Sequence, residues 1–320
     1  MPSDPVRTVV VADPIDAAAL ELLRSGPCRV VDATSGAEAL VPALAEAWGL
    51  IVRSRTKVTA DLIAKSPNLT IVARAGVGVD NVDLPAATAR GIRVVNAPSA
   101  ATAAVAELTV AFLLLLARGL YLRIVETKSG TWKRGENGGE LRGKTVGFVG
   151  YGRIAREAAQ RLVPFGVTPL AYDPFVPSSP DGTTMVELDE LLARSDFVSL
   201  HAALTPENHH LLDARRIGRM KPGAFLVNVA RGPLVDEAAL LTALDGGALG
   251  GAALDVFEVE PPARAQLLGH PKVLATPHLG ASTREGQALA GRQVVEEMLR
   301  ALRGEPLQAL VNPEASRAAP

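Results

Sequence analysis

Short apolar runs alternate with amphipathic segments along the whole chain. In its N-terminal third the apolar runs predict strands and the segments between them predict helices. The predicted strands are Arg7 to Ala12, Leu50 to Arg53, Leu69 to Ala73 and Arg93 to Val95, and the helices include Ile15 to Arg24 and Leu84 to Arg90. Regular alternation of strand and helix is typical of an α/β fold with a parallel sheet.

The rest of the chain repeats this pattern after a long break. An Ala- and Leu-rich helix is predicted from Ala101 to Ala117, and a polar stretch with several glycines follows from Lys128 to Arg142. A second α/β unit begins at Lys144, and its predicted strands end at Val149, Tyr172, Leu200, Val229, Leu254 and Ala275. A last amphipathic helix is predicted from Arg284 to Arg303.

A glycine turn opens this second unit. Gly150 and Gly152 lie between a predicted strand and a predicted helix that begins at Arg153 and Ile154, and Asp173 closes the next strand. In a dinucleotide-binding turn, the first glycine permits the tight bend and the second lets the backbone approach a pyrophosphate at the helix N-terminus. An acid about 20 residues further on accepts the ribose hydroxyls. Because a free carboxylate repels a 2′-phosphate, the sequence predicts NAD rather than NADP.

The position of this turn in mid-chain predicts the domain organisation. A cofactor domain over residues 99–283 would be inserted into a substrate-binding domain made of residues 1–98 and 284–320. The expected fold is therefore α/β, with a flavodoxin-like and an NAD-binding domain, both Rossmann-like, and a cleft between them. Such a cleft is a common place for a small-molecule site.

Polar side chains follow the predicted strand ends of the second unit, where ligands sit in open α/β sheets. His278 is the predicted proton acceptor because imidazole titrates near neutral pH, although a loop hydrogen bond would explain it equally well. Glu260 would hold that imidazole, unless it is merely an exposed acid before two prolines. Arg231 offers a planar fork for a carboxylate. His201 ranks lower as a catalyst and is expected to line the adenine side, while His209 and His210 are expected to face solvent.

Composition excludes several classes of function. The net charge of −1 over 320 residues gives no bulk attraction to nucleic acid or to anionic lipid. Met1 to Pro5 lack the features of a signal peptide, and the longest apolar run, Val110 to Ala117, is too short to span a bilayer. Cys28 is the single cysteine, so a cytoplasmic location is expected and no cysteine metal cluster or other metal site is predicted.

Several longer motifs, in order along the chain, resemble those of the D-isomer-specific 2-hydroxyacid dehydrogenase family. They are residues 73–83, 141–155, 220–237, 253–262 and 276–280. The resemblance implies NAD as cofactor, a homodimer, and a catalytic trio that falls on Arg231, Glu260 and His278. It implies cofactor contacts from Val77, Thr102, Gly150, Gly152, Arg153, Ile154, Asp173, His201, Ala202, Pro206, Ala230, Arg231, Asp255, His278 and Gly280.

The substrate is expected to be a small D-2-hydroxy acid, with or without a phosphate group. The resemblance assigns its binding to Arg53, Ser54, Arg74, Val77, Gly78, Arg231 and His278, and two arginine-bearing strand ends suit a phosphate. The segment Trp132-Lys133-Arg134 resembles one that reaches into a partner subunit. Ala101 and Ala104 depart from the polar residues usual in the family, and no C-terminal regulatory domain is expected.

Three other functions stay open at this point. A glyoxylate or hydroxypyruvate reductase, or another D-2-hydroxyacid dehydrogenase, would carry the same trio. Relatives of the family also serve as NAD-sensing co-regulators that bind peptides without turnover. A metal-dependent enzyme is the third, although no convincing ligand cluster supports it.

Overall fold

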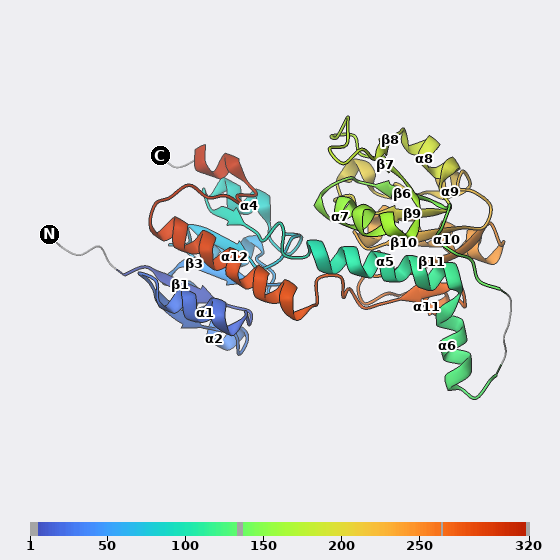
Figure 1. The fold of residues 1–320 in the computed structure, drawn as a ribbon. Coiled ribbons are helices and arrows are strands. Elements are labelled where there is room, and N and C mark those ends of the chain that lie inside the picture. Colours follow the sequence, from blue (N-terminus) through green and yellow to red (C-terminus); the bar gives the residue numbers. More distant parts are fainter. Residues whose placement is uncertain (1–5, 133–136, 264, 318–320) are drawn as a thin grey trace. The chain divides into compact units, whose positions relative to one another are not determined.

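A computed structural model describes residues 6–132, 137–263 and 265–317, and its chain divides into two compact units (Figure 1). Unit 1 comprises residues 1–101 and 281–320, and unit 2 comprises residues 102–280. The predicted boundaries after residues 98 and 283 lie three residues from the observed ones after 101 and 280.

Unit 1 is built on one parallel sheet. Within the described residues this sheet has five strands in the order β2-β1-β3-β4-β5. The strands are β1 (Thr8–Val11), β2 (Arg29–Asp32), β3 (Ala47–Val52), β4 (Ile71–Arg74) and β5 (Arg93–Val95). The order reverses between β1 and β3, so the loops after these two strands diverge at a topological switch point.

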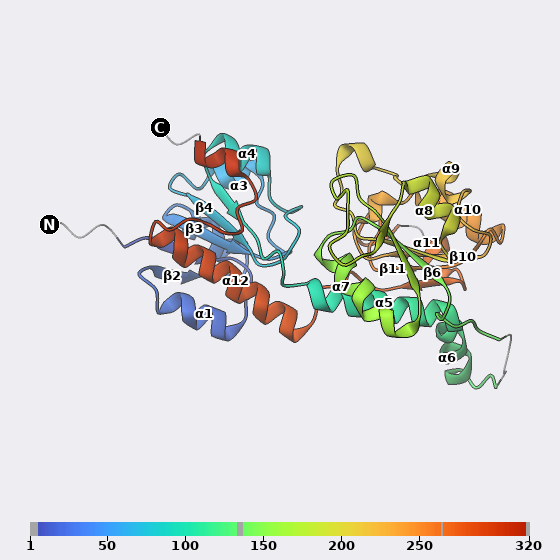
Figure 2. The same ribbon diagram turned by 45° about the horizontal axis from the view of Figure 1, so that its top comes forward.

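Helices cover both faces of this sheet (Figure 2). Val9 and Val11 pack with helices α1 (Ala17–Arg24) and α12 (Arg284–Leu302) on one face. Val10 and Ala12 point to the other face, which is covered by α2 (Ala37–Leu44), α3 (Ala60–Ala64) and α4 (Leu84–Ala89). This alternation of fully buried strand residues explains why the strands read as continuous apolar runs in the sequence.

Unit 2 contains the larger sheet, which within the described residues has seven strands in the order β12-β11-β10-β9-β6-β7-β8. The paired strands run parallel. They are β6 (Thr145–Val149), β7 (Thr168–Tyr172), β8 (Thr184–Met185), β9 (Phe197–Leu200), β10 (Ala224–Asn228), β11 (Leu249–Leu254) and β12 (Val273–Ala275). Here the order reverses between β6 and β9.

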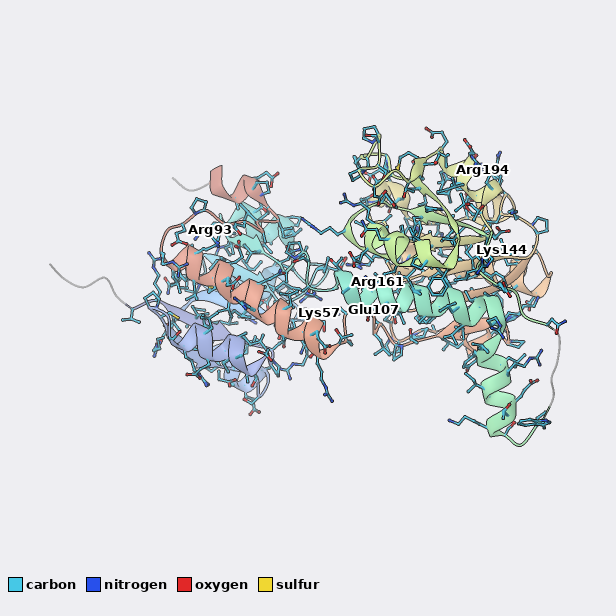
Figure 3. The ribbon with its side chains drawn as sticks, in the orientation of Figure 1. Lys57, Arg93, Glu107, Lys144, Arg161 and Arg194 are labelled. Carbon is cyan, nitrogen blue, oxygen red and sulfur yellow. The ribbon has the colours of Figure 1, made fainter. Side chains whose placement is uncertain are left out.

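Two groups of helices flank this sheet. Helices α5 (Thr102–Arg118) and α7 (Arg153–Leu162) pack against each other, and Arg161 of α7 lies 3.6 Å from Glu107 of α5 (Figure 3). The core on the other face includes residues of α8 (Leu188–Arg194), α9 (Ala214–Ile217) and α10 (Glu237–Asp245). The shorter helices are α11 (Ala265–Gly269) and the 3₁₀ segments η1 (Val163–Phe165), η2 (Pro206–Asn208), η3 (Gly232–Leu234) and, in unit 1, η4 (Pro313–Arg317).

Helix α6 (Leu120–Lys128) follows α5 after a sharp bend. Among the described residues, no single helix is long and apolar enough to cross a membrane, and only α5 and α6 together, bent by 74°, meet a test of length and composition. None of the residues of α6 is buried.

The predicted α/β class with two Rossmann-like sheets is confirmed, and most predicted strand ends match the observed ones. Four predicted ends were each wrong by one residue. They are Ala12, Arg53, Ala73 and Val229, whereas the strands stop at Val11, Val52, Arg74 and Asn228. Strand β2, strand β8 and helix α6 were not predicted. β2 is only partly buried, β8 has two residues, and α6 buries no face, so none of them carries a clear hydrophobic period.

Candidate active site

The glycine turn after β6 lies at the switch point of the larger sheet. Gly150 has φ +84°, and a Cβ added there would meet the backbone nitrogen of Ala202, after β9, at 2.6 Å. Only glycine satisfies both the backbone angle and this close approach. Gly152 has φ −82°, and a Cβ there would meet nothing within 4 Å. The first glycine is therefore required by the fold, while the second leaves open space over the turn.

The region around this turn fits a dinucleotide. Helix α7 begins at Arg153 and Ile154, and its N-cap Gly152 provides no side-chain hydrogen bond, so the first amides can bind a phosphate. Ala155, which replaces the third glycine of the pattern, is fully buried. In the described part of the chain, the hydroxyl of Thr102 is buried without a hydrogen-bond partner. An orphaned hydroxyl at the start of α5 is what a missing polar ligand would leave.

Asp173 stands directly after β7, beside the glycine turn. Its Oδ2 accepts a hydrogen bond from the amide of Tyr151 at 2.8 Å, and its Oδ1 accepts one from the amide of Phe175 at 2.9 Å. A carboxylate offers about four acceptor positions. Each oxygen therefore retains capacity for a ribose hydroxyl while the two amides fix the orientation of the group.

We expect Asp173→Asn to lower the preference for NAD over NADP, measured as the ratio of the two kcat/KM values, by about tenfold or more. The substitution removes a negative charge, and like-charge juxtaposition in a binding site costs several kcal/mol. Asp189→Asn, which alters a carboxylate on α8 that pairs with Arg215 and Arg219, is the control. An unchanged ratio in the Asp173 variant would show that Asp173 does not contact the ribose.

His201 follows β9 on the other side of the switch point. Its Nε2 lies 2.8 Å from Oγ of Ser199. Burial lowers the pKa of His201 to about 3, so this imidazole is neutral at physiological pH. A neutral, partly buried ring suits a wall of a binding site and is unsuited to hold a proton during turnover.

This shift predicts a pH dependence of stability. Between the ordinary value of 6.5 and about 3, the unfolded chain binds a proton at residue 201 that the folded chain does not. The free energy of unfolding therefore decreases as pH falls through this window. Denaturation by urea at pH 7.5 and pH 5 measures the effect. His201→Gln should reduce the loss of stability between these pH values, whereas substitution of exposed His209 by Gln should not.

His278 and Glu260 form a pair after β12 and β11. Nδ1 of His278 lies 2.8 Å from Oε2 of Glu260, and the two side chains are 53% and 39% exposed. The second oxygen of Glu260 accepts a hydrogen bond from the amide of Phe257 at 3.2 Å. The carboxylate thus orients the imidazole through Nδ1 and directs Nε2 away from the pair.

The backbone of His278 adopts an unusual conformation, with φ +52°. Asp255, which is 1% exposed, holds this turn: its carboxylate accepts hydrogen bonds from the amides of Leu279 at 2.7 Å and Gly280 at 2.8 Å and from the hydroxyl of Thr276 at 2.6 Å. Left-handed backbone at a non-glycine residue persists only where the surroundings enforce it. Asp255 was predicted as a cofactor contact. In the structure its carboxylate binds the turn that carries His278.

Arg231 lies in the loop between β10 and η3 in the same unit. Asn228 fixes its backbone, because the amide of that buried side chain donates to the carbonyl of Arg231 at 2.9 Å. The next residue must be glycine, since a Cβ on Gly232 would fall 1.8 Å from the carbonyl carbon of Phe257. This close approach brings the Arg231 loop against the segment that leads to Glu260. Nη1 of Arg231 donates to the carbonyl of Ala230 at 2.7 Å.

The remaining predicted cofactor residues of unit 2 lie at the same edge of its sheet. Ala202 follows His201, Pro206 begins η2, and Gly280 is buried beside Asp255. Ala101 and Ala104, where the family often has polar residues, are buried.

The predicted substrate residues of unit 1 follow β3 and β4. Arg53 and Ser54 come directly after β3, and Arg74 ends β4. The guanidinium of Arg74 folds back over Gly76, and the side-chain amide of Asn96 donates to the carbonyl of Val77, next to Gly78, at 2.6 Å. Lys133 and Arg134 lie outside the described residues, as do Met1 to Pro5, whereas Trp132 is 86% exposed.

One expectation for the histidines was wrong. His210 is only partly exposed, and its Nε2 lies 3.0 Å from Oε1 of Glu258, whereas His209 is exposed. Sequence reasoning also missed Asn228 and the hydrogen bonds by which Asp255 holds the turn of His278, because a polar residue that braces a loop carries no spacing signal. In the described part of the chain, no three His, Cys, Asp or Glu side chains are grouped to hold a metal ion.

Comparisons with known proteins agree with this geometry. Residues 110–280 match the family model of the D-isomer specific 2-hydroxyacid dehydrogenase, NAD binding domain. A curated relative, D-3-phosphoglycerate dehydrogenase of Methanocaldococcus jannaschii, is 44% identical over 310 residues, which cover 95% of this chain and 59% of the relative. The chain thus spans about three fifths of that relative's length.

Two solved structures are similar over nearly their full length. A glyoxylate reductase from Paecilomyes thermophila is 30% identical with a TM-score of 0.88, and the match covers 97% of this chain and 99% of that one. An NAD-dependent formate dehydrogenase from Staphylococcus aureus in complex with NAD is 32% identical with a TM-score of 0.84, covering 96% and 99%. The predicted cofactor, NAD, is confirmed by the domain match. The chain belongs to the D-isomer specific 2-hydroxyacid dehydrogenase family.

Proposed function

We propose that this protein is an NAD-dependent dehydrogenase that interconverts a D-2-hydroxy acid and its 2-keto acid. The observation that carries the proposal is the pair of His278 and Glu260, 2.8 Å apart, in the unit that contains the NAD-binding turn. A histidine oriented by a carboxylate is well suited to general base catalysis.

Each member of the trio has a distinct role. Arg231 binds the substrate carboxylate and polarises the oxygen that becomes the carbonyl. Nε2 of His278 takes the proton of the substrate hydroxyl, and Glu260 stabilises the resulting imidazolium through Nδ1. NAD, when bound, would supply the acceptor for the hydride that leaves carbon 2 of the substrate. In the reverse direction His278 returns the proton to the carbonyl oxygen.

The residues that would hold NAD surround the glycine turn. Gly152 and the first amides of α7 would bind the pyrophosphate, and Asp173 the ribose. His201, Ala202 and Pro206 would line the adenine side, and Thr102, Ala230 and Gly280 would contact the nicotinamide half. Asp255 would act mainly by holding the turn of His278.

We further propose 3-phosphoglycerate as the substrate, with 3-phosphohydroxypyruvate as the product that enters serine biosynthesis. The M. jannaschii relative is named a D-3-phosphoglycerate dehydrogenase, and the arginines of unit 1, Arg53 and Arg74, suit a dianionic phosphate. Ser54, Val77 and Gly78 would contribute hydroxyl and backbone contacts to the same substrate.

Initial rates of NADH formation with a panel of hydroxy acids test this proposal. We expect kcat/KM for 3-phosphoglycerate to exceed that for D-glycerate by about 10²-fold, because a charge-assisted phosphate contact contributes roughly 1.5–3 kcal/mol. Higher activity in the reverse direction with glyoxylate or hydroxypyruvate would instead make the protein a reductase like the P. thermophila relative. Binding of NAD without turnover on any 2-hydroxy or 2-keto acid would favour a co-regulator.

We propose a homodimer that uses helix α6. Apolar side chains are exposed along this short helix: Leu120 37%, Tyr121 47%, Leu122 36%, Ile124 50% and Val125 47%. A cluster of exposed apolar residues on a helix with no buried face is typical of a protein interface. A cytoplasmic location remains a prediction from the sequence.

Ile124→Glu is expected to convert the dimer to a monomer, because it places a charge in the centre of this apolar surface. Light scattering after gel filtration measures the mass. Leu289→Glu, at a position on α12 that is 42% exposed, is the matched control and should remain dimeric. A dimer in both variants would place the interface elsewhere.

A further inference from the structure

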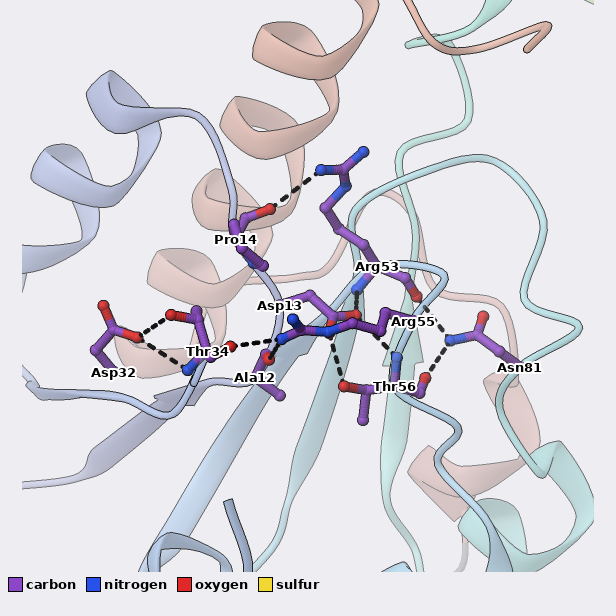
Figure 4. A network of polar contacts seen from close by, with 9 residues as sticks. All are labelled: Ala12, Asp13, Pro14, Asp32, Thr34, Arg53, Arg55, Thr56 and Asn81. Carbon is purple, nitrogen blue, oxygen red and sulfur yellow. Dashed lines mark hydrogen bonds and ion pairs between the residues drawn. The ribbon is translucent and has the colours of Figure 1, made fainter. Parts of the chain in front are cut away.

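Asp13 is a buried carboxylate at the carboxyl end of β1. It is 1% exposed, and its oxygens accept four hydrogen bonds from described residues (Figure 4). The donors are the amide of Arg53 at 2.7 Å, the amide and hydroxyl of Thr56 at 3.1 and 2.7 Å, and Nε of Arg55 at 3.1 Å. All four belong to the loop that follows β3, so one carboxylate organises the whole loop.

This loop occupies the place where a ligand is expected. β1 and β3 are the strands between which the order of the smaller sheet reverses. In open α/β sheets, ligands bind outside the carboxyl ends of the strands at such a switch point. A second brace comes from Asn81, whose side-chain amide donates to the carbonyls of Arg53 and Thr56, both at 2.7 Å.

The two arginines of the loop have different surroundings. Arg55 lies across Asp13, and its Nη2 also donates to the carbonyls of Ala12 at 2.9 Å and Thr34 at 2.8 Å. The guanidinium of Arg53 points away from Asp13 and makes one long contact, 3.3 Å to the carbonyl of Pro14 (Figure 4). Asp13 therefore neutralises Arg55, while the charge of Arg53 has no carboxylate partner among the described residues.

Asp13 is ionised in the folded protein. Burial alone would raise the pKa of a carboxyl group, yet the hydrogen bonds from Thr56, Arg53 and Arg55 outweigh it, and the pKa of Asp13 lies below its ordinary value. A charged carboxylate with its acceptor positions filled is a rigid brace, and it has no capacity left for a ligand.

We propose that Asp13 is a positioning residue for substrate specificity: it fixes the Arg53–Thr56 loop so that Arg53, and not Arg55, meets an anionic group of the substrate distant from the reacting carbon. This inference rests on the proposed dehydrogenase function and deepens it. On this proposal Arg55 has a structural role. Asp13 contributes to discrimination between phosphorylated and unphosphorylated 2-hydroxy acids although it does not contact the substrate.

Steady-state kinetics of Asp13→Asn with 3-phosphoglycerate and with D-glycerate test the proposal. For 3-phosphoglycerate we expect KM to rise about tenfold while kcat stays within about twofold of wild type, because the lost phosphate contact is made equally in the ground state and the transition state. KM for D-glycerate should also stay within about twofold of wild type. Asp16→Asn is the matched control. Asp16 caps helix α1 through the amides of Ala18 and Ala19, so the kinetics of this variant should be unchanged.

A double-mutant cycle separates positioning from general destabilisation. If Asp13 acts through Arg53, Asp13→Asn should add nothing to the KM of Arg53→Ala, whereas independent effects would multiply. Equal changes of KM for both substrates, or multiplicative effects in the cycle, would overturn the proposal. If Asp13→Asn does not fold, Arg55→Met removes the hydrogen bond between Arg55 and Asp13 from the arginine side, and the same change of KM is expected. Absence of turnover by the wild-type protein with every 2-hydroxy acid would instead reject the proposed function.

Discussion

Replacing His278 by alanine is expected to lower kcat by about 10²-fold or more while leaving the affinity for NAD unchanged. General acid–base catalysis contributes roughly 10²–10⁴-fold, and Glu260 holds the imidazole of His278 through Nδ1 at 2.8 Å. His201 cannot substitute, because its pKa of about 3 keeps it neutral. Cofactor affinity should persist because the glycine turn lies after a different strand.

The companion variant Glu260→Gln distinguishes two contributions of Glu260: orientation of the His278 imidazole and the negative charge beside it. Glutamine still accepts a hydrogen bond from Nδ1 of His278, but it does not stabilise an imidazolium, so an intermediate loss of kcat is expected. Fluorescence titration with NADH provides the affinity of both variants. Wild-type turnover in His278→Ala would refute the role of this residue, and a parallel loss of NADH binding would indicate that the turn itself had collapsed.

The second large effect concerns the two glycines of the cofactor turn. Alanine at Gly150 should lower stability, whereas alanine at Gly152 should weaken NAD binding. Gly150→Ala forces an L-residue to φ +84° and places a methyl group 2.6 Å from the nitrogen of Ala202. A left-handed residue costs roughly 1–2 kcal/mol, and the backbone overlap adds to it. We expect a decrease in Tm of about 5 °C or more.

Gly152→Ala should leave stability unchanged but abolish tight NAD binding. Its backbone, at φ −82° and ψ −162°, accepts alanine, and the added methyl group meets nothing within 4 Å. That empty space is where the pyrophosphate is expected to approach, so the methyl group would raise Kd for NAD by on the order of tenfold or more. Thermal unfolding with and without NAD measures both properties. Equal NAD affinity in Gly152→Ala and wild type would show that the pyrophosphate does not bind against Gly152.

The order of elements, and much of the candidate site, could be predicted from the sequence because its signals are local. The spacing of Gly150, Gly152 and Asp173 predicts the dinucleotide-binding turn, and continuous apolar runs predict the buried parallel strands. Elements without a buried face gave no signal. Strand β2 is only partly buried, and helix α6 has no buried residue.

The braces of the site were harder to predict for a different reason. Asp13 acts on a loop that starts 40 residues later in the sequence, and Asp255 on a turn that starts 21 residues later. The contacts of these carboxylates exist only after the parallel strands have aligned their ends. A single sequence shows that such an acid follows a strand, but it does not show which loop the acid holds.

A crystal structure of the complex with NAD and a 2-keto acid most directly tests the claim that Arg231, Glu260 and His278 act together on the reacting carbon. We predict Nε2 of His278 within about 2.6–3.2 Å of the carbonyl oxygen of the ligand, with Arg231 on its carboxylate and Glu260 still on Nδ1. An imidazole of His278 turned away from the ligand, with no carboxylate beside it, would contradict the account.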